Sequence, residues 1–228
     1  LVRGWSRSVR VGAQAGVARG GVRGHGREMR SIAHTFVFSL LVASALVGVA
    51  GCERVLGFFS EPKAQVDEPL RYEKDEISFL YPGNWKVAEE VTQENGVELR
   101  TINVESAGNA LLMVQSFKPA VEIDLGEHIE LTMGAMQEEV GKQVGGLADS
   151  TRGSVTDFER EFLGARRMGK KAAITITALG EKVPSSVALI GAVLEDRTVL
   201  LFTTIPDEDR ASVEAGFDQV ISSLKLGK

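Results

Sequence analysis

The sequence predicts an α+β domain in which an antiparallel β-sheet carries helices on both faces. Most of the chain after residue 70 alternates apolar and polar residues with a period of two, in segments separated by turn residues. Two segments switch to helical spacing. The stretches from Val187 to Leu194 and from Val199 to Phe202 are almost continuously apolar, which is typical of strands covered on both faces. Together these patterns favour an α/β/α sandwich.

The first block of predicted strands is a series of antiparallel hairpins. Clusters such as Pro82-Gly83-Asn84 and Glu94-Asn95-Gly96 lie between the apolar runs and favour tight turns. The predicted strands are Arg71 to Lys74, Glu76 to Leu80, Trp85 to Val91, Gly96 to Val104 and Ala110 to Phe117.

A helix and a second strand block follow. Between Glu127 and Val144, apolar residues recur at helical spacing, beginning with Ile129, Met133 and Met136. The period then returns to two, which predicts strands at Ser154 to Leu163, Lys170 to Ala178, Val183 to Leu194 and Thr198 to Ile205.

A last helix is predicted to start at Pro206 and Asp207. Its apolar stripe consists of Val213, Phe217, Val220, Ile221 and Leu224, all on one helical face. This stripe supplies a cover for one side of the sheet.

The segment ahead of the domain has the parts of an export signal. Met29-Arg30 is a short positive start, an uncharged stretch runs from Ser31 to Gly51, and small residues precede the only cysteine of the chain. Val49-Ala50-Gly51-Cys52 resembles a bacterial lipobox. That resemblance implies a lipoprotein signal peptide over residues 29–51, cut before Cys52, which then carries lipid. An uncleaved transmembrane anchor is the alternative.

The signal divides the chain into four parts. Residues 1–28 have no helical or alternating period, so we expect a non-native extension with Met29 as the true start. Residues 52–69 are predicted to be a lipidated tether, with Val55, Leu56, Phe58 and Phe59 in the bilayer interface. The folded domain is expected at residues 70–228.

The charge of the part after the signal restricts its partners. Seven of the 26 Lys and Arg residues and one of the 31 Asp and Glu residues precede Cys52, which leaves a net charge of −11. An acidic chain argues against nucleic acid as a partner, because phosphate binding needs a basic surface. No thiol remains once Cys52 is acylated, so an internal disulfide is excluded.

The residue inventory also restricts the chemistry. His128 is the only histidine after the signal, so a catalytic triad would have to use it and a His/Cys zinc site is excluded in its usual forms. No nucleophile-elbow pattern accompanies His128. We therefore expect no enzyme, no metal site and no cofactor.

Three other groups of residues are candidates for binding. Asp157, Glu159 and Glu161 alternate along one strand face and suit Ca²⁺, a basic partner or, more simply, solvent. A basic group straddles Gly169 in an expected hairpin turn, where it protects a sheet edge or contacts anionic lipid or an acidic partner. Its members are Arg166, Arg167, Lys170 and Lys171.

The third group is an aromatic pair at a turn. Tyr81 and Trp85 either line a binding cleft or fold back onto the core, with Trp85 under the last helix against Phe217 or Val220.

Two passages resemble the PsbP-like domain family. The first, Ile77 to Val87 (ISFLYPGNWKV), has an apolar strand, a Tyr-Pro turn and a Trp that starts the next strand. The second, Phe217 to Leu226 (FDQVISSLKL), is similar to the closing helix of that family. Bacterial lipoproteins of the DcrB type are also similar. The resemblance implies an antiparallel α/β/α sandwich from about Leu70 to Leu226, with a non-enzymatic role in assembly or interaction at a membrane.

These observations lead to one expected function and one alternative. The expected protein is lipid-anchored through Cys52 in a bacterial cell envelope, faces the periplasm or exterior, and interacts there with an envelope protein. The alternative is an envelope carrier of a small ligand or metal ion in a cleft near Tyr81 to Trp85.

Overall fold

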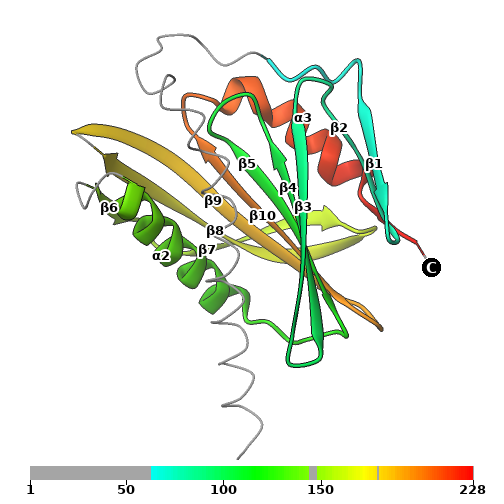
Figure 1. The fold of residues 1–228 in the computed structure, drawn as a ribbon. Coiled ribbons are helices and arrows are strands. Elements are labelled where there is room, and N and C mark those ends of the chain that lie inside the picture. Colours follow the sequence, from blue (N-terminus) through cyan, green and yellow to red (C-terminus); the bar gives the residue numbers. More distant parts are fainter. Residues whose placement is uncertain (1–62, 144–147, 179, 228) are drawn as a thin grey trace, which may run out of the picture.

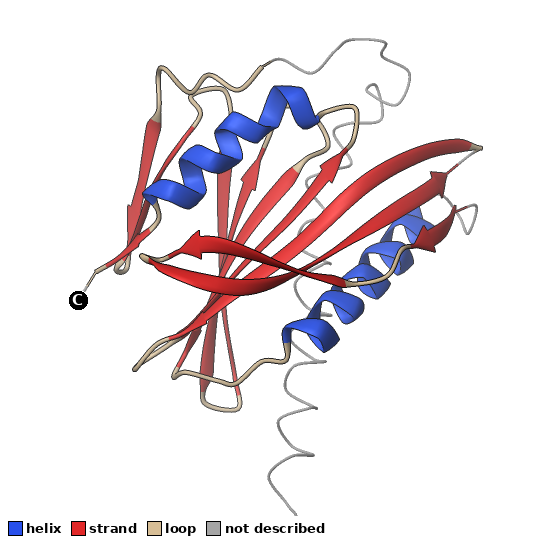
Figure 2. Cartoon of the chain, turned by 180° about the vertical axis from the view of Figure 1, so that it is seen from behind, coloured by secondary structure: helices blue, strands red, loops and turns tan. Residues whose placement is uncertain are grey.

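The computed structural model describes residues 63–143, 148–178 and 180–227. These residues form three layers (Figures 1 and 2). Helix α2 (Leu125–Gln143) covers one face of an eight-stranded antiparallel sheet. Helix α3 (Arg210–Ser223) and a small three-stranded sheet cover the other. The predicted fold class, an antiparallel sheet with helices on both faces, is confirmed.

The large sheet has the order β3-β4-β5-β10-β9-β8-β6, and β7 also pairs with β8. Neighbouring strands are antiparallel, and β5 and β10 pair although α2 and four strands separate them in sequence. The bounds are β3 Lys86–Glu94, β4 Val97–Glu105, β5 Leu111–Lys118, β6 Ala148–Arg152, β7 Thr156–Phe162, β8 Ala165–Ala178, β9 Glu181–Val193 and β10 Thr198–Pro206.

The small sheet has the order β1-β2-β11 and brings the two ends of the described chain together. It consists of β1 (Leu70–Lys74), β2 (Ile77–Tyr81) and β11 (Lys225–Leu226). The sequence did not predict β11, because two residues are too few to show a period.

Alternation along the strands explains the two separate cores. On β4, Leu99 faces the α2 side, while Ile102 faces the α3 side. On β10, Leu200 and Leu201 divide in the same way, so central strands are apolar on both faces, as their continuous hydrophobic runs predicted.

Helix α2 begins after a side-chain cap. The carboxylate of Asp124 accepts a hydrogen bond from the backbone N–H of Glu127 at 2.9 Å. Ile129 and Met133 are fully buried against the sheet, as the helical spacing predicted. The predicted start at Glu127 lies two residues after the observed one.

Helix α3 buries the predicted stripe. Val213, Phe217, Val220 and Ile221 are buried, as is Leu224 just after the helix. They pack with Ile77 and Phe79 of β2, so α3 holds the small sheet against the large one.

Two expectations about the hairpin and the boundary differ from the structure. The turn predicted around Gly169 is instead at Leu163 and Gly164, both with positive φ. Gly169 lies within β8, and the position requires glycine because a Cβ there would come 2.5 Å from the ring of Phe158. The chain is also already packed on the domain at Ala64, which is 9% exposed, before the expected start at Leu70.

The lipobox residues Val49, Ala50, Gly51 and Cys52 and the signal segment lie outside the described residues. In the described part of the chain, no helix is long and apolar enough to span a membrane.

Candidate functional site

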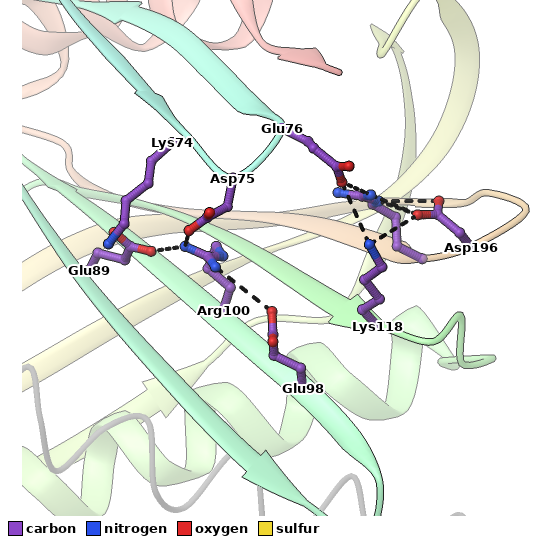
Figure 3. Close-up of polar contacts among 9 residues, drawn as sticks. Lys74, Asp75, Glu76, Glu89, Glu98, Arg100, Lys118 and Asp196 are labelled. Atoms are coloured by element: carbon purple, nitrogen blue, oxygen red, sulfur yellow. Dashed lines mark hydrogen bonds and ion pairs between the residues drawn. The ribbon is translucent and has the colours of Figure 1, made fainter. Parts of the chain in front are cut away.

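A network of charged side chains surrounds the tip of the β1–β2 hairpin (Figure 3). Asp75 and Glu76 form this tip with φ values of 45° and 71°, the left-handed region that non-glycine residues rarely adopt. Asp75 reaches a cation on β4, and Glu76 reaches cations on β5 and at the β9–β10 turn. We call this network the hairpin clamp; its cations are Arg100, Lys118 and Arg197.

One half of the hairpin clamp is centred on Arg100. Its side chain is 11% exposed, and its Nη1 lies 2.8 Å from Asp75 and contacts Glu89 on β3. Lys74 Nζ also lies 2.8 Å from Glu89, so the small sheet is joined to β3 and β4 by charge (Figure 3). Tyr72 lies in the same region, where burial and then Glu89 raise the pKa of its phenol to about 12.

The other half is centred on Arg197, whose side chain is 7% exposed. Its Nη2 donates to Asp196 at 2.7 Å and to Glu76. The hydrogen bonds from Arg197 hold the pKa values of both carboxyls below their ordinary values, and those to Asp196 and Glu76 raise the pKa of Arg197 itself. Lys118 lies 3.6 Å from Glu76 and 3.8 Å from Asp196.

The ion pairs of the hairpin clamp are suited to hold the small sheet against the large one. Each arginine fork is occupied by carboxylates from neighbouring elements, which suits a fixed junction between two sheets. Sequence reasoning did not find it, since its members come from β1–β2, β3, β4, β5 and the β9–β10 turn. The positions of Arg100 and Arg197 beside apolar strand residues were the available signal.

Of the aromatic pair at the predicted cleft, Trp85 lies in the core and Tyr81 lies at the edge of the core. Trp85 is 4% exposed and meets Phe217 edge to face, as the core alternative predicted. Tyr81 is half-buried and lies 6.2 Å from Phe79 between ring centroids. Trp85 Nε1 is buried without a hydrogen-bond partner among the described residues.

The turn between these two aromatics is covered by residues 63–68, which we call the strap. Gly83 N–H donates to the carbonyl of Gln65 at 3.2 Å, and Gln65 N–H donates to the Asn84 side chain at 3.0 Å. Asn84 Nδ2 donates to the carbonyl of Lys63 at 3.1 Å. The strap therefore occupies the outside of the turn near which the sequence placed a cleft.

The acidic and basic groups considered separately in the sequence lie on the same hairpin. Strands β7 and β8 pair so that Lys170 Nζ lies 2.6 Å from Asp157, and Arg166 Nε lies 2.8 Å from Glu159. Two of the three carboxylates considered for Ca²⁺ are therefore paired with basic side chains. Within the described residues, no group of three or more His, Cys, Asp and Glu side chains is arranged to hold a metal ion.

His128 lies on α2 and is 5% exposed. Burial lowers the pKa of its imidazole to about 4, so the ring is neutral at pH 7. Its Nδ1 has no hydrogen-bond partner in the described part of the chain. The hydroxyl of Thr132 donates to the backbone carbonyl of His128 at 2.8 Å, and no described hydrogen bond joins the imidazole to a nucleophile.

The fold and the hairpin clamp define a three-layer α+β sandwich with two sheets docked by buried arginines. No protein-family model matches the chain, and no curated protein sequence matches it. Its structure is similar to the PsbP protein (CyanoP) of Synechocystis sp. PCC 6803, with 13% identity, a TM-score of 0.41, and coverage of 75% of this chain and 95% of that chain.

It is also similar to LpqN of Mycobacterium tuberculosis, which is involved in cell envelope biogenesis. The identity is 7% and the TM-score 0.36, with coverage of 71% of this chain and 90% of that chain. At these identities and TM-scores the likenesses carry no argument about activity or partners. Membership in the PsbP-like family, and the DcrB type within it, stays a prediction.

Proposed function

We propose that the chain is a lipid-anchored protein of the bacterial cell envelope whose domain is a non-enzymatic interaction or assembly module. The observation that carries the proposal is the lipobox at Val49 to Cys52, followed closely by a folded sandwich. Acylation of Cys52 would hold the domain at a membrane, where it would face the periplasm or exterior.

The charged residues of the domain suit a structural and interacting role. The ion pairs of Asp75 with Arg100 and of Glu76 with Arg197 join one element to another, and the β7–β8 hairpin is also closed by ion pairs. The surface available to a partner includes the outer edge of β3, a nine-residue strand that, among the described strands of the large sheet, pairs only with β4. Sheet edges are common sites for partner strands.

The carrier alternative rests on a cleft near Tyr81 to Trp85. The packing of Trp85 against Phe217 and the position of the strap over the same turn disfavour it. The observation in its favour is that Nε1 of Trp85 has no hydrogen-bond partner among the described residues.

Metabolic labelling tests the anchor. Labelled palmitate is expected in the wild-type protein and not in the Cys52→Ser variant; equal labelling of both would overturn the proposal.

A second measurement distinguishes an interaction module from a carrier. A stoichiometric protein partner recovered from solubilised membranes, and lost in a variant with charges added to the β3 edge, supports the module. A ligand-dependent rise in melting temperature without such a partner supports the carrier.

A further inference from the structure

The strap joins the chain to one end of the domain. We propose that it holds the domain with the Pro82–Asn84 turn toward the membrane and the β3–β4 turn away from it. The proposal rests on lipidation of Cys52 and adds to it a fixed orientation.

The strap is a built part of the domain, and its contacts reach helix α3 as well as the turn. Ala64 is buried, and its N–H donates to the carbonyl of Ser212 in the first turn of α3 at 2.9 Å. Further along the strap, the carbonyl of Val66 accepts a hydrogen bond from Gln219 Nε2 at 2.9 Å. These contacts, with those to Gly83 and Asn84, place the pivot between anchor and domain at Lys63.

The chain between the anchor and the pivot is short. Residues 53–62 separate Cys52 from Lys63. Even fully extended, this segment spans at most about 40 Å. If Val55 to Phe59 lie in the bilayer interface, only Ser60 to Pro62 remain as a spacer, with a reach of about 14 Å.

The opposite end of the domain lies far from the pivot. Strand β3 starts directly after Trp85 and runs for nine residues to the β3–β4 turn at Asn95 and Gly96. Nine residues of strand extend for about 30 Å. Figure 1 shows the described start of the chain at one end of the molecule and the β3–β4 turn at the other. A spacer this short keeps the first end nearer to the bilayer.

Surface charge does not provide an alternative cause for this orientation. The strap contains two acidic residues, Asp67 and Glu68, and one basic residue, Lys63. Just before α3, Asp207 and Glu208 add two further acidic residues. An acidic end is not attracted to anionic headgroups. The attachment itself therefore sets the orientation.

Energy transfer to the membrane surface tests the orientation. Cys52 is the only cysteine, so one added cysteine accepts a donor dye at a known place once Cys52 is acylated. The full-length lipidated protein is placed in phosphatidylcholine vesicles that contain a trace of headgroup-labelled acceptor lipid. One variant carries the dye near the pivot (Asp67→Cys) and the other near the β3–β4 turn (Gln93→Cys); both positions are exposed.

Transfer from position 67 is expected to be several-fold more efficient than from position 93. A flexible Gly-Ser insertion of about twelve residues between Glu61 and Pro62 should reduce that ratio, because it lengthens the spacer. Equal transfer from the two positions, or stronger transfer from position 93, would overturn the orientation while leaving the anchor intact. Failure of the wild-type protein to associate with vesicles, in the way expected of Cys52→Ser, would overturn the proposed anchor and remove the basis of the orientation.

Discussion

The indole of Trp85 meets the ring of Phe217 edge to face, with ring centroids 5.4 Å apart and an interplanar angle of 81°. Trp85 immediately precedes β3, and Phe217 lies in the middle of α3, so this contact joins the large sheet to its covering helix. Edge-to-face pairs add to the stabilisation that burial alone provides.

Replacing this indole should destabilise the domain. Trp85→Ala is expected to lower the free energy of unfolding by about 3 to 5 kcal/mol, because it removes a large aromatic from a packed core. Trp85 is the only tryptophan after the signal segment, so its emission should be blue-shifted and poorly quenched by iodide. Red-shifted emission typical of an exposed indole, together with unchanged stability of the alanine variant, would favour the cleft alternative.

A glycine on α3 makes this contact fit. A Cβ on Gly216 would lie 2.5 Å from Cη2 of Trp85 and 2.8 Å from Cγ of Pro82. Gly216→Ala should therefore destabilise by about 1 to 3 kcal/mol through overpacking, although alanine favours the helix by about 1 kcal/mol.

Gly141 provides the matched control for this substitution. It lies in α2, and a Cβ there would meet nothing within 4 Å. Gly141→Ala should raise stability by up to about 1 kcal/mol in the same denaturant titration. Equal effects of the two substitutions would contradict the role assigned to Gly216.

The strap places the residues from Lys63 onward in the folded domain. A fragment of residues 63–228 should unfold cooperatively, while one of residues 70–228 should be less stable by about 2 to 4 kcal/mol, because it loses several hydrogen bonds and the burial of Ala64. Asn84→Ala in the longer fragment should reproduce part of this loss. If both fragments have the same denaturation midpoint and slope, the strap contributes nothing to the fold.

The elements that the sequence predicted well are those with a local signal. The apolar period from Val213 to Leu224 is complete within one helix. The start of a strand near the buried Trp85 was likewise indicated by the turn residues directly before it. The strap has no such signal, since its backbone groups bond to the backbones of the distant Ser212 and Gly83 and to the side chain of Asn84.

The β7–β8 turn shows a second kind of limit. Gly164 and Gly169 both lie between the predicted strands Ser154 to Leu163 and Lys170 to Ala178, but only Gly164 has positive φ. Gly169 is instead required because Phe158 on the paired strand fills the space of a side chain. The choice between them depends on packing, which a single sequence does not show.

The hairpin clamp should contribute to stability in a charge-dependent way. Arg197→Met is expected to destabilise by about 1 to 3 kcal/mol, because it removes charge-assisted hydrogen bonds from a buried side chain. Glu76→Gln should cost less, since that carboxylate is partly exposed. A double-mutant cycle should show coupling between the two changes.

The pKa shift of Glu76 gives the hairpin clamp a defined pH range. Its folded pKa lies below the ordinary value near 4.5, so its contribution is present above that pH and is lost as the pH falls through the folded pKa. The stability of Glu76→Gln should therefore approach that of the wild type in acid. A difference that persists at pH 2 would contradict the ionic origin of the effect.

His128 should make stability depend on pH in a higher range. Burial lowers its folded pKa to about 4 from 6.5, so the unfolded chain takes up a proton first as the pH falls. Its contribution is complete above pH 6.5 and falls by about 3 kcal/mol as the pH approaches 4. His128→Leu should remove this fall and leave stability at pH 7 equal or higher, because Nδ1 has no described partner. Denaturant titrations of the fragment of residues 63–228 between pH 7 and pH 4 measure the effect as the difference between the wild type and the variant, and His128 is the only histidine of this fragment. A His128→Leu variant that loses stability over this range as steeply as the wild type would show that the imidazole is not buried in neutral form.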